Sequence, residues 1–102
     1  MIWHSLIVTP DGRFLGSLEF LFESVGRIRE CQIIQEQLSD FVIRVVPLAG
    51  FTRADEGAMV RSARRMLGAG VTVHIDQVPS IPRTRSGKVK YVVSRVGKPW
   101  QA

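Results

Sequence analysis

Two strand-like runs stand next to each other in RIRECQIIQEQLSDFVIRVVPL, residues 27–48, and they decide the fold. Residues 27–37 and 41–48 are both rich in β-branched and other apolar side chains, which is typical of β-strands. Only Leu38, Ser39 and Asp40 separate them, a length suited to a hairpin connection. Pro47 closes the second run, because proline cannot donate a hydrogen bond to a sheet. The stretch therefore predicts a long antiparallel β-hairpin.

A shorter hairpin and a helix are predicted before this stretch. Residues 9–13, Thr-Pro-Asp-Gly-Arg, carry proline at the second and glycine at the fourth position of a tight turn. This turn would join residues 6–8 to residues 14–15. Ser17 can cap the helix that follows, because apolar side chains recur after it at helical spacing until Gly26.

Residues 52–76 predict a second helix and another strand. Thr52 can cap this helix, whose acidic first turn and basic last turn both match the helix dipole. Gly68 ends the helix, and residues 71–76 then alternate between apolar and polar as a half-buried strand does. A right-handed crossover from residues 41–48 would place this strand parallel to them, with the strand at residues 27–37 between the two.

The last patterned segment, residues 89–96, has the composition of a strand but the spacing of a helix. Its four valines lie at i, i+3, i+4 and i+7, so we predict a helix. The whole chain, residues 1–102, is then a single α+β domain. It would contain a small antiparallel three-stranded sheet packed with helices, plus an N-terminal β-hairpin.

Size and composition agree with one soluble cytoplasmic domain. The chain has 102 residues and 45% hydrophobic content, so it can bury roughly 60–70% of its unfolded surface around one core. Its one cysteine, Cys31, lies in an apolar strand pattern and is predicted to be a buried hydrophobic residue in a reducing compartment. No apolar run has the ~18 residues of a membrane span, and residues 1–10 lack the features of a signal peptide.

Positive charge is concentrated in the C-terminal quarter. No acidic residue follows Asp76, whereas six Lys and Arg residues do; residues 1–76 hold eight basic against nine acidic residues. The net charge of +5 therefore belongs to the end of the chain. Such a distribution predicts an anionic partner for that end, either a phosphate, a nucleotide, a nucleic acid or a carboxylate.

The basic segment contains a specific motif, Pro82-Arg83-Thr84-Arg85-Ser86-Gly87-Lys88. Its pattern, Pro-x-Thr-x-x-Gly-Lys, resembles the C-terminal signature of the adenylate-forming enzymes, the acyl-CoA synthetase and ligase superfamily. In that superfamily, the C-terminal domain is a lid on a larger domain that binds the acid, ATP and magnesium. The resemblance implies that Lys88 is the catalytic lysine. It places near the phosphates Thr84, Arg85, Ser86, Gly87 and Lys90.

The resemblance extends over nearly the whole chain. Residues 9–13 and the Gln-Ile-Ile-Gln run at 32–35 are similar to the phenylacetate-CoA ligase and capsular-polysaccharide (coenzyme F390 synthetase-like) branch. Two positions depart from that branch: Tyr91 stands where it usually carries a basic residue, and the acidic hinge residue before residue 9 is missing. Gln32 and Gln35, at i and i+3 of a strand, point to opposite faces, so one is predicted to be partly buried and hydrogen-bonded.

Three function classes follow. The first is a lid domain of an adenylate-forming ligase, which would act with a larger adenylation domain; ATP, magnesium and CoA are implied only with that domain. The sequence lacks three common binding motifs: Gly-x-x-x-x-Gly-Lys-Ser/Thr, Gly-x-Gly-x-x-Gly and His-x-x-x-His. We therefore expect no cofactor or metal on this chain alone. The second class is a non-enzymatic module that keeps the lid fold, expected as a homodimer. A nucleic-acid binder ranks last, because neither an aromatic platform nor a known groove-reading element accompanies the six basic residues.

Overall fold

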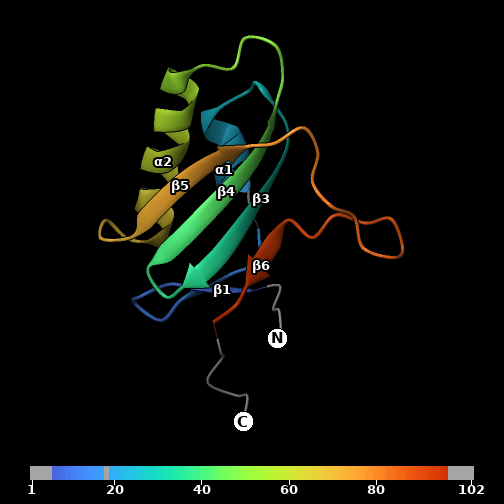
Figure 1. Cartoon of the computed structure of the whole chain (residues 1–102). Helices are drawn as coiled ribbons and strands as arrows, with labels where there is room; N and C mark the ends of the chain where they lie inside the picture. Colours follow the sequence, from blue (N-terminus) through green and yellow to red (C-terminus); the bar gives the residue numbers. More distant parts are fainter. Residues whose placement is uncertain (1–5, 18, 97–102) are drawn as a thin grey trace.

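The computed structural model describes residues 6–17 and 19–96 and shows an α+β fold, as predicted (Figure 1). Both helices lie on the same side of a four-stranded sheet, and a two-stranded hairpin lies at one end of it. In chain order the elements are β1 (Ile7–Val8), β2 (Phe14–Leu15), α1 (Glu19–Ser24), β3 (Ile28–Gln37), β4 (Asp40–Pro47), α2 (Arg53–Leu67), β5 (Thr72–Gln77) and β6 (Val92–Ser94).

The sheet is mixed and has the strand order β5-β4-β3-β6. The long hairpin of β3 and β4 is confirmed and is antiparallel, while β5 runs parallel to β4 and β6 parallel to β3. The predicted parallel direction of β5 relative to β4 is confirmed, but the predicted three-stranded antiparallel sheet, with β3 between β4 and β5, is wrong. The crossover through α2 brings β5 directly against the outer edge of β4, which leaves the other edge of β3 for β6.

The predicted helix at residues 89–96 is also wrong, because this segment adds β6 to the sheet. The Ile33 amide donates to the Tyr91 carbonyl over 2.8 Å, and the Arg95 amide donates to the Gln35 carbonyl over 2.9 Å. All three residues of β6 are buried, which means that both faces of the strand are covered. Valines in a strand covered on both faces need no alternation, so helical spacing was a misleading signal and strand propensity prevailed.

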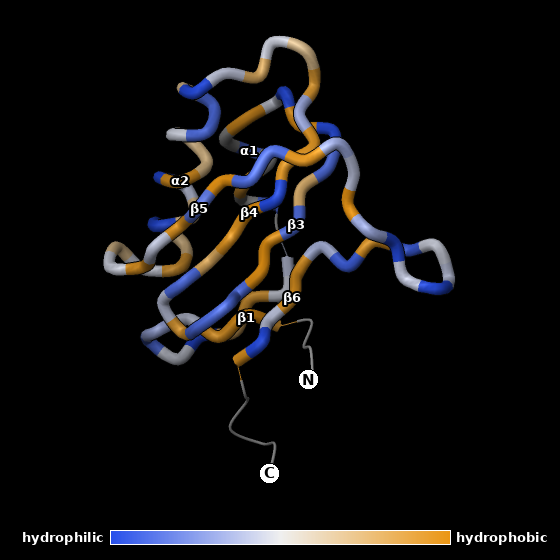
Figure 2. Tube along the Cα trace, in the orientation of Figure 1, coloured by the Kyte–Doolittle hydropathy of each residue, from blue (hydrophilic) through white to orange (hydrophobic). Residues whose placement is uncertain are grey.

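The main core lies between the sheet and the two helices. Along β3 and β4, alternate side chains face the helices, and Figure 2 shows the apolar positions that these strands contribute. The predicted cap of α2 is present, since Thr52 and Asp55 form a reciprocal capping box. Neither helix in the described part of the chain is long and apolar enough to cross a bilayer. The largest fully buried side chains of this core are Phe41, Ile7, Leu21, Ile33, Ile43, Met59 and Leu67.

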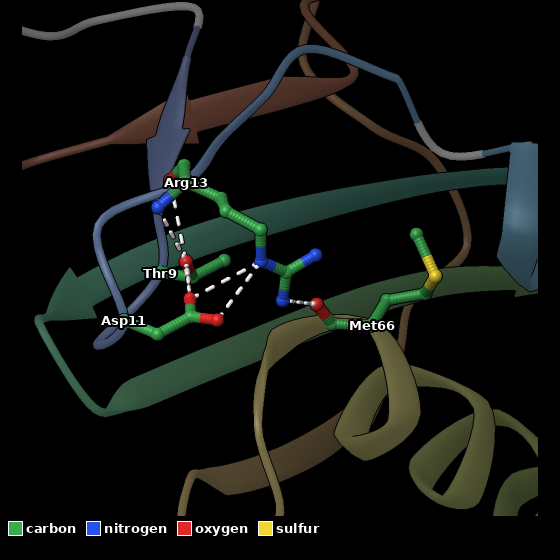
Figure 3. Close-up of polar contacts among 4 residues, drawn as sticks. All are labelled: Thr9, Asp11, Arg13 and Met66. Carbon is green, nitrogen blue, oxygen red and sulfur yellow. Dashed lines mark hydrogen bonds and ion pairs between the residues drawn. The ribbon is translucent and has the colours of Figure 1, made fainter.

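The N-terminal hairpin is confirmed, and it is fixed to the body of the domain (Figure 3). Gly12, with φ of 90°, donates its amide to the Thr9 carbonyl over 2.9 Å and closes the predicted turn. Arg13 pairs with Asp11 at 3.0 Å, and its Nη2 donates to the Met66 carbonyl at the end of α2 over 2.7 Å. Hydrogen bonds from Thr9 and Arg13 to the Asp11 carboxylate lower its pKa below the ordinary value.

Cys31 is fully buried in the main core, as predicted. Burial raises the pKa of its thiol to about 12, because the thiolate would lose its hydration. The thiol therefore stays protonated at neutral pH, and Cys31 packs as a small apolar side chain rather than acting as a nucleophile.

Candidate functional site

The lysine loop, residues 82–90, joins the end of β5 to β6 and ends in a tight turn. The Gly87 amide donates to the Thr84 carbonyl over 2.9 Å, and the Thr84 amide donates to the Lys88 carbonyl over 2.7 Å. Gly87 has φ of 82°, a conformation that residues with a side chain rarely adopt. Glycine is thus required at this position by the backbone of the turn itself.

Two hydroxyl groups complete the turn. The Thr84 and Ser86 hydroxyl oxygens lie 3.1 Å apart, and Thr84 Oγ1 also accepts from the Lys88 amide over 3.3 Å. These contacts fix the backbone that carries Lys88 while its side chain remains exposed. The predicted site residues Thr84, Ser86, Gly87 and Lys88 are therefore brought together in one hydrogen-bonded turn.

Figure 1 shows the lysine loop extending away from the sheet, and Figure 2 shows that its tip is hydrophilic. Arg85 lies at this tip and is exposed, as are Lys88 and Lys90. Among the ion pairs of the described residues, none involves these three side chains. Three cations are therefore presented to solvent on the projecting lysine loop, an arrangement that attracts anions.

The two stems of the lysine loop are attached to β3 by residues that the sequence analysis did not select for the site. On the incoming stem, Arg83 Nη2 donates to Glu30 Oε1 over 2.9 Å. On the outgoing stem, the Lys90 carbonyl accepts from Gln32 Nε2 over 2.7 Å. The sequence does show two polar residues, Glu30 and Gln32, on the same face of one predicted strand. It does not show that they contact Arg83 and Lys90, which lie more than 50 positions further along the chain.

The prediction for the two glutamines of β3 needs one correction. One of the pair is predicted to be partly buried, but Gln35 is completely buried and Gln32 is also buried, with 7% of its surface exposed. They do point to opposite faces of the strand. Gln32 contacts the lysine loop through the Lys90 carbonyl, whereas Gln35 contacts Val8 of β1 and Ser94 of β6.

Two cavities lined by described residues lie away from the turn that carries Lys88. One of about 400 Å³ is lined by Arg29, Val46, Pro47, Gln77, Val78 and Pro79, and another of about 380 Å³ lies beside β2 and α1. Neither includes a residue of the lysine loop in its lining. Within residues 6–17 and 19–96, no group of three or more His, Cys, Asp or Glu residues could hold a metal. Lys88 thus projects toward open solvent rather than into either of these cavities.

The described residues form a small α+β domain whose projecting loop exposes Lys88. The chain belongs to the CapK C-terminal domain family, whose model matches residues 7–95. This match includes both hairpins, both helices and the whole lysine loop.

A solved structure has the same fold. Acetoacetyl-CoA synthetase from Streptomyces lividans matches with a TM-score of 0.57 and 24% sequence identity. The match covers 83% of this chain but only 13% of the synthetase chain. At this identity the likeness shows the fold alone. No curated protein matches the chain.

Proposed function

We propose that this chain is the C-terminal domain of an AMP-forming acyl- or aryl-CoA ligase-like enzyme and supplies Lys88 for carboxylate adenylation. The observation that carries the proposal is the exposed Lys88 on a hydrogen-bonded, projecting turn in a chain of the CapK C-terminal domain family. A larger adenylation domain, fused to this chain or separate from it, would hold the acid and Mg-ATP. This chain alone would bind no cofactor.

The chemistry explains why one lysine is needed. In adenylation, a carboxylate oxygen forms a bond to the α-phosphorus of ATP, and the bond to pyrophosphate breaks. Two anions must approach each other, and negative charge grows on the phosphate in the transition state. The Lys88 ammonium is a compact charge on a long side chain, so it can contact a carboxylate oxygen and a phosphate oxygen together.

The remaining loop residues would support this role without reacting. Gly87 allows the backbone to come close to the substrate, and Thr84 and Ser86 keep the turn in shape. Arg85 and Lys90 add positive charge that attracts the anionic nucleotide. Within the superfamily we propose the phenylacetate-CoA ligase and capsular-polysaccharide branch on the basis of residues 9–13 and 32–35. We propose the cytoplasm as its location, because the single cysteine Cys31 suits a reducing compartment.

A reconstitution experiment tests the proposal. The chain alone should bind Mg-ATP weakly or not at all in calorimetry and should release no pyrophosphate with a panel of carboxylic acids. Lys88 is a single stabilising cation, and the two cavities described above are not lined by its loop. Added to its adenylation partner, it should restore pyrophosphate release. Micromolar ATP affinity or turnover by the chain alone would contradict the proposal, as would a partner whose activity does not depend on this chain.

The second candidate is a non-enzymatic module that forms a homodimer. It is favoured by the position of β5 at the outer edge of the sheet, where its free side pairs with no strand among the described residues. A second copy could cover this edge and the surface that would otherwise face the larger domain. Sedimentation at tens of micromolar should then show a species of twice 11.4 kDa. A monomer alone at that concentration would rule this candidate out.

A further inference from the structure

Both ends of the lysine loop contact neighbouring positions of one strand. Glu30 and Gln32 are two residues apart on β3, and their register partners on β4 are Val46 and Arg44. Residues two apart on a strand have side chains on the same face, so both point toward the loop. Glu30 holds the stem before the turn, and Gln32 holds the stem after it.

The contact on the incoming stem is an ion pair between two side chains that differ in their exposure to solvent. The Glu30 side chain is 19% exposed, whereas the Arg83 side chain is 50% exposed. Only Oε1 of Glu30 is paired with Arg83, and the buried Oε2 has no hydrogen-bond partner. A half-buried carboxylate with an unsatisfied oxygen depends strongly on its one cation, so Glu30 favours the position of Arg83 that the structure has.

The contact on the outgoing stem is made by an oriented amide. Gln32 Nε2 donates to the Lys90 carbonyl over 2.7 Å, and Gln32 Oε1 accepts from Arg44 Nη1 over 3.5 Å. Rotating the amide by half a turn would place oxygen against the Lys90 carbonyl and nitrogen against the guanidinium, so both contacts would be lost. The arginine of β4 therefore selects the orientation in which Gln32 can hold the loop.

We propose that Glu30 and Gln32 are positioning residues for Lys88, clamping the two stems of the lysine loop to β3. The inference rests on the proposed function, because it assigns the clamp a role in the reaction of Lys88. Between the clamped stems, residues 84–88 are closed by their own hydrogen bonds, so fixing the stems fixes the direction in which the turn projects. If the stems were not held, residues 84–88 would keep their internal hydrogen bonds but would move together as a rigid body relative to the sheet.

The clamp can be measured in this chain without any partner. Backbone ¹⁵N relaxation should report a well-ordered Gly87 amide in the parent chain. Glu30→Arg should lower the Gly87 heteronuclear NOE through repulsion of Arg83, and the double variant Glu30→Arg with Arg83→Glu should restore it by exchanging the charges. Gln32→Glu should also lower it, because a carboxylate cannot donate to the Lys90 carbonyl.

Matched controls lie further along β3. Glu36 forms an ion pair of 2.6 Å with Arg95 outside the loop, and Gln37 is exposed at the end of the strand. Glu36→Arg and Gln37→Glu should leave the Gly87 NOE unchanged. The clamp is refuted if the Glu30 and Gln32 variants keep the parent value, or if the charge-exchanged pair is as mobile as Glu30→Arg.

Catalysis separates the clamp from the proposed function. With the adenylation partner, Glu30→Arg should reduce kcat on the order of 10- to 100-fold with little change in KM, since misplacing a catalytic group by about 1 Å can have effects of this size. Charge exchange should recover most of the loss. If Lys88→Ala abolishes the gain from this chain but the clamp variants retain full kcat, the clamp has no catalytic role. If no variant at position 88 matters, the proposed function fails, while the relaxation data still decide whether the clamp exists.

Discussion

Lys88→Ala is expected to reduce acyl-adenylate formation by the reconstituted enzyme on the order of 100- to 1,000-fold, the typical effect of removing one preorganised stabiliser of transition-state charge. The Lys88 side chain is exposed, and its backbone is held by contacts of Thr84, so the variant should fold as the parent does. Lys88→Arg should also lose most activity, because a planar guanidinium cannot replace a compact charge that contacts two oxygens. Single-turnover pyrophosphate release measures both losses.

Arg85→Ala and Lys90→Ala are the matched controls for Lys88→Ala. Each removes one exposed cation of the same loop, and the Lys90 carbonyl that accepts from Gln32 is kept when its side chain is truncated. Both variants should lose only a few-fold in rate, with a loss that shrinks as salt is added, since their effect is diffuse. Equal and modest losses for all three alanine variants would mean that the loop acts as a general basic patch, and the assignment of Lys88 would be wrong.

Elements with complete local signals could be predicted from the sequence. The turn at residues 9–12 closes as its proline and glycine require, and α2 begins and ends where Thr52 and Gly68 place its caps. The β3–β4 hairpin follows from two apolar runs and a short connection. In each case the residues that determine the element lie within it or directly beside it, so no knowledge of distant partners is needed.

Elements whose structure depends on distant partners could not be predicted. Residues 92–94 form a strand because they pair with the edge of β3. No pattern within residues 89–96 indicates that this edge is available for pairing. The four valines of residues 89–96 fit the apolar stripe of a helix and a strand buried on both faces equally well. The order of the sheet has the same origin, since α2 can deliver β5 to either side of the hairpin and only packing decides between them.

The candidate site divides in the same way. The motif of residues 82–88 identifies the turn, and the hydrogen bonds of Thr84 and Gly87 explain why those residue types occur there. Glu30 was not selected, because its contact with Arg83 spans 53 positions and exists only in the folded sheet. The residues of the turn itself can be identified from the sequence, whereas a residue such as Glu30, which contacts the loop from a distant strand, is found only in the structure.

Gln35→Ala is expected to destabilise the domain by about 2–4 kcal/mol, because it removes buried hydrogen bonds and leaves a cavity. The Gln35 side chain is completely buried. Its Nε2 donates to the Val8 carbonyl over 2.6 Å and to the Leu38 carbonyl over 3.2 Å. Its Oε1 accepts from the Ser94 hydroxyl over 2.7 Å and from the Val8 amide over 3.2 Å. One amide group thus joins β1, β3 and β6.

The melting temperature of Gln35→Ala should therefore fall on the order of 10–20 °C in a thermal denaturation experiment followed by circular dichroism. Gln37→Ala, two residues further along β3 and exposed, should change the unfolding free energy by less than about 0.5 kcal/mol. Gln35→Glu separates the hydrogen bonds from the packing, since it keeps the shape but buries a carboxyl group whose pKa must rise in the folded state. The loss of unfolding free energy in Gln35→Glu, relative to the parent, should be smallest below the ordinary glutamate pKa of about 4.3. It should grow as the pH rises through the pKa that the carboxyl group has in the folded state. If Gln35→Glu matched the parent at pH 7, the amide would not be joining the three strands through its donors, and β1 would be held by packing alone.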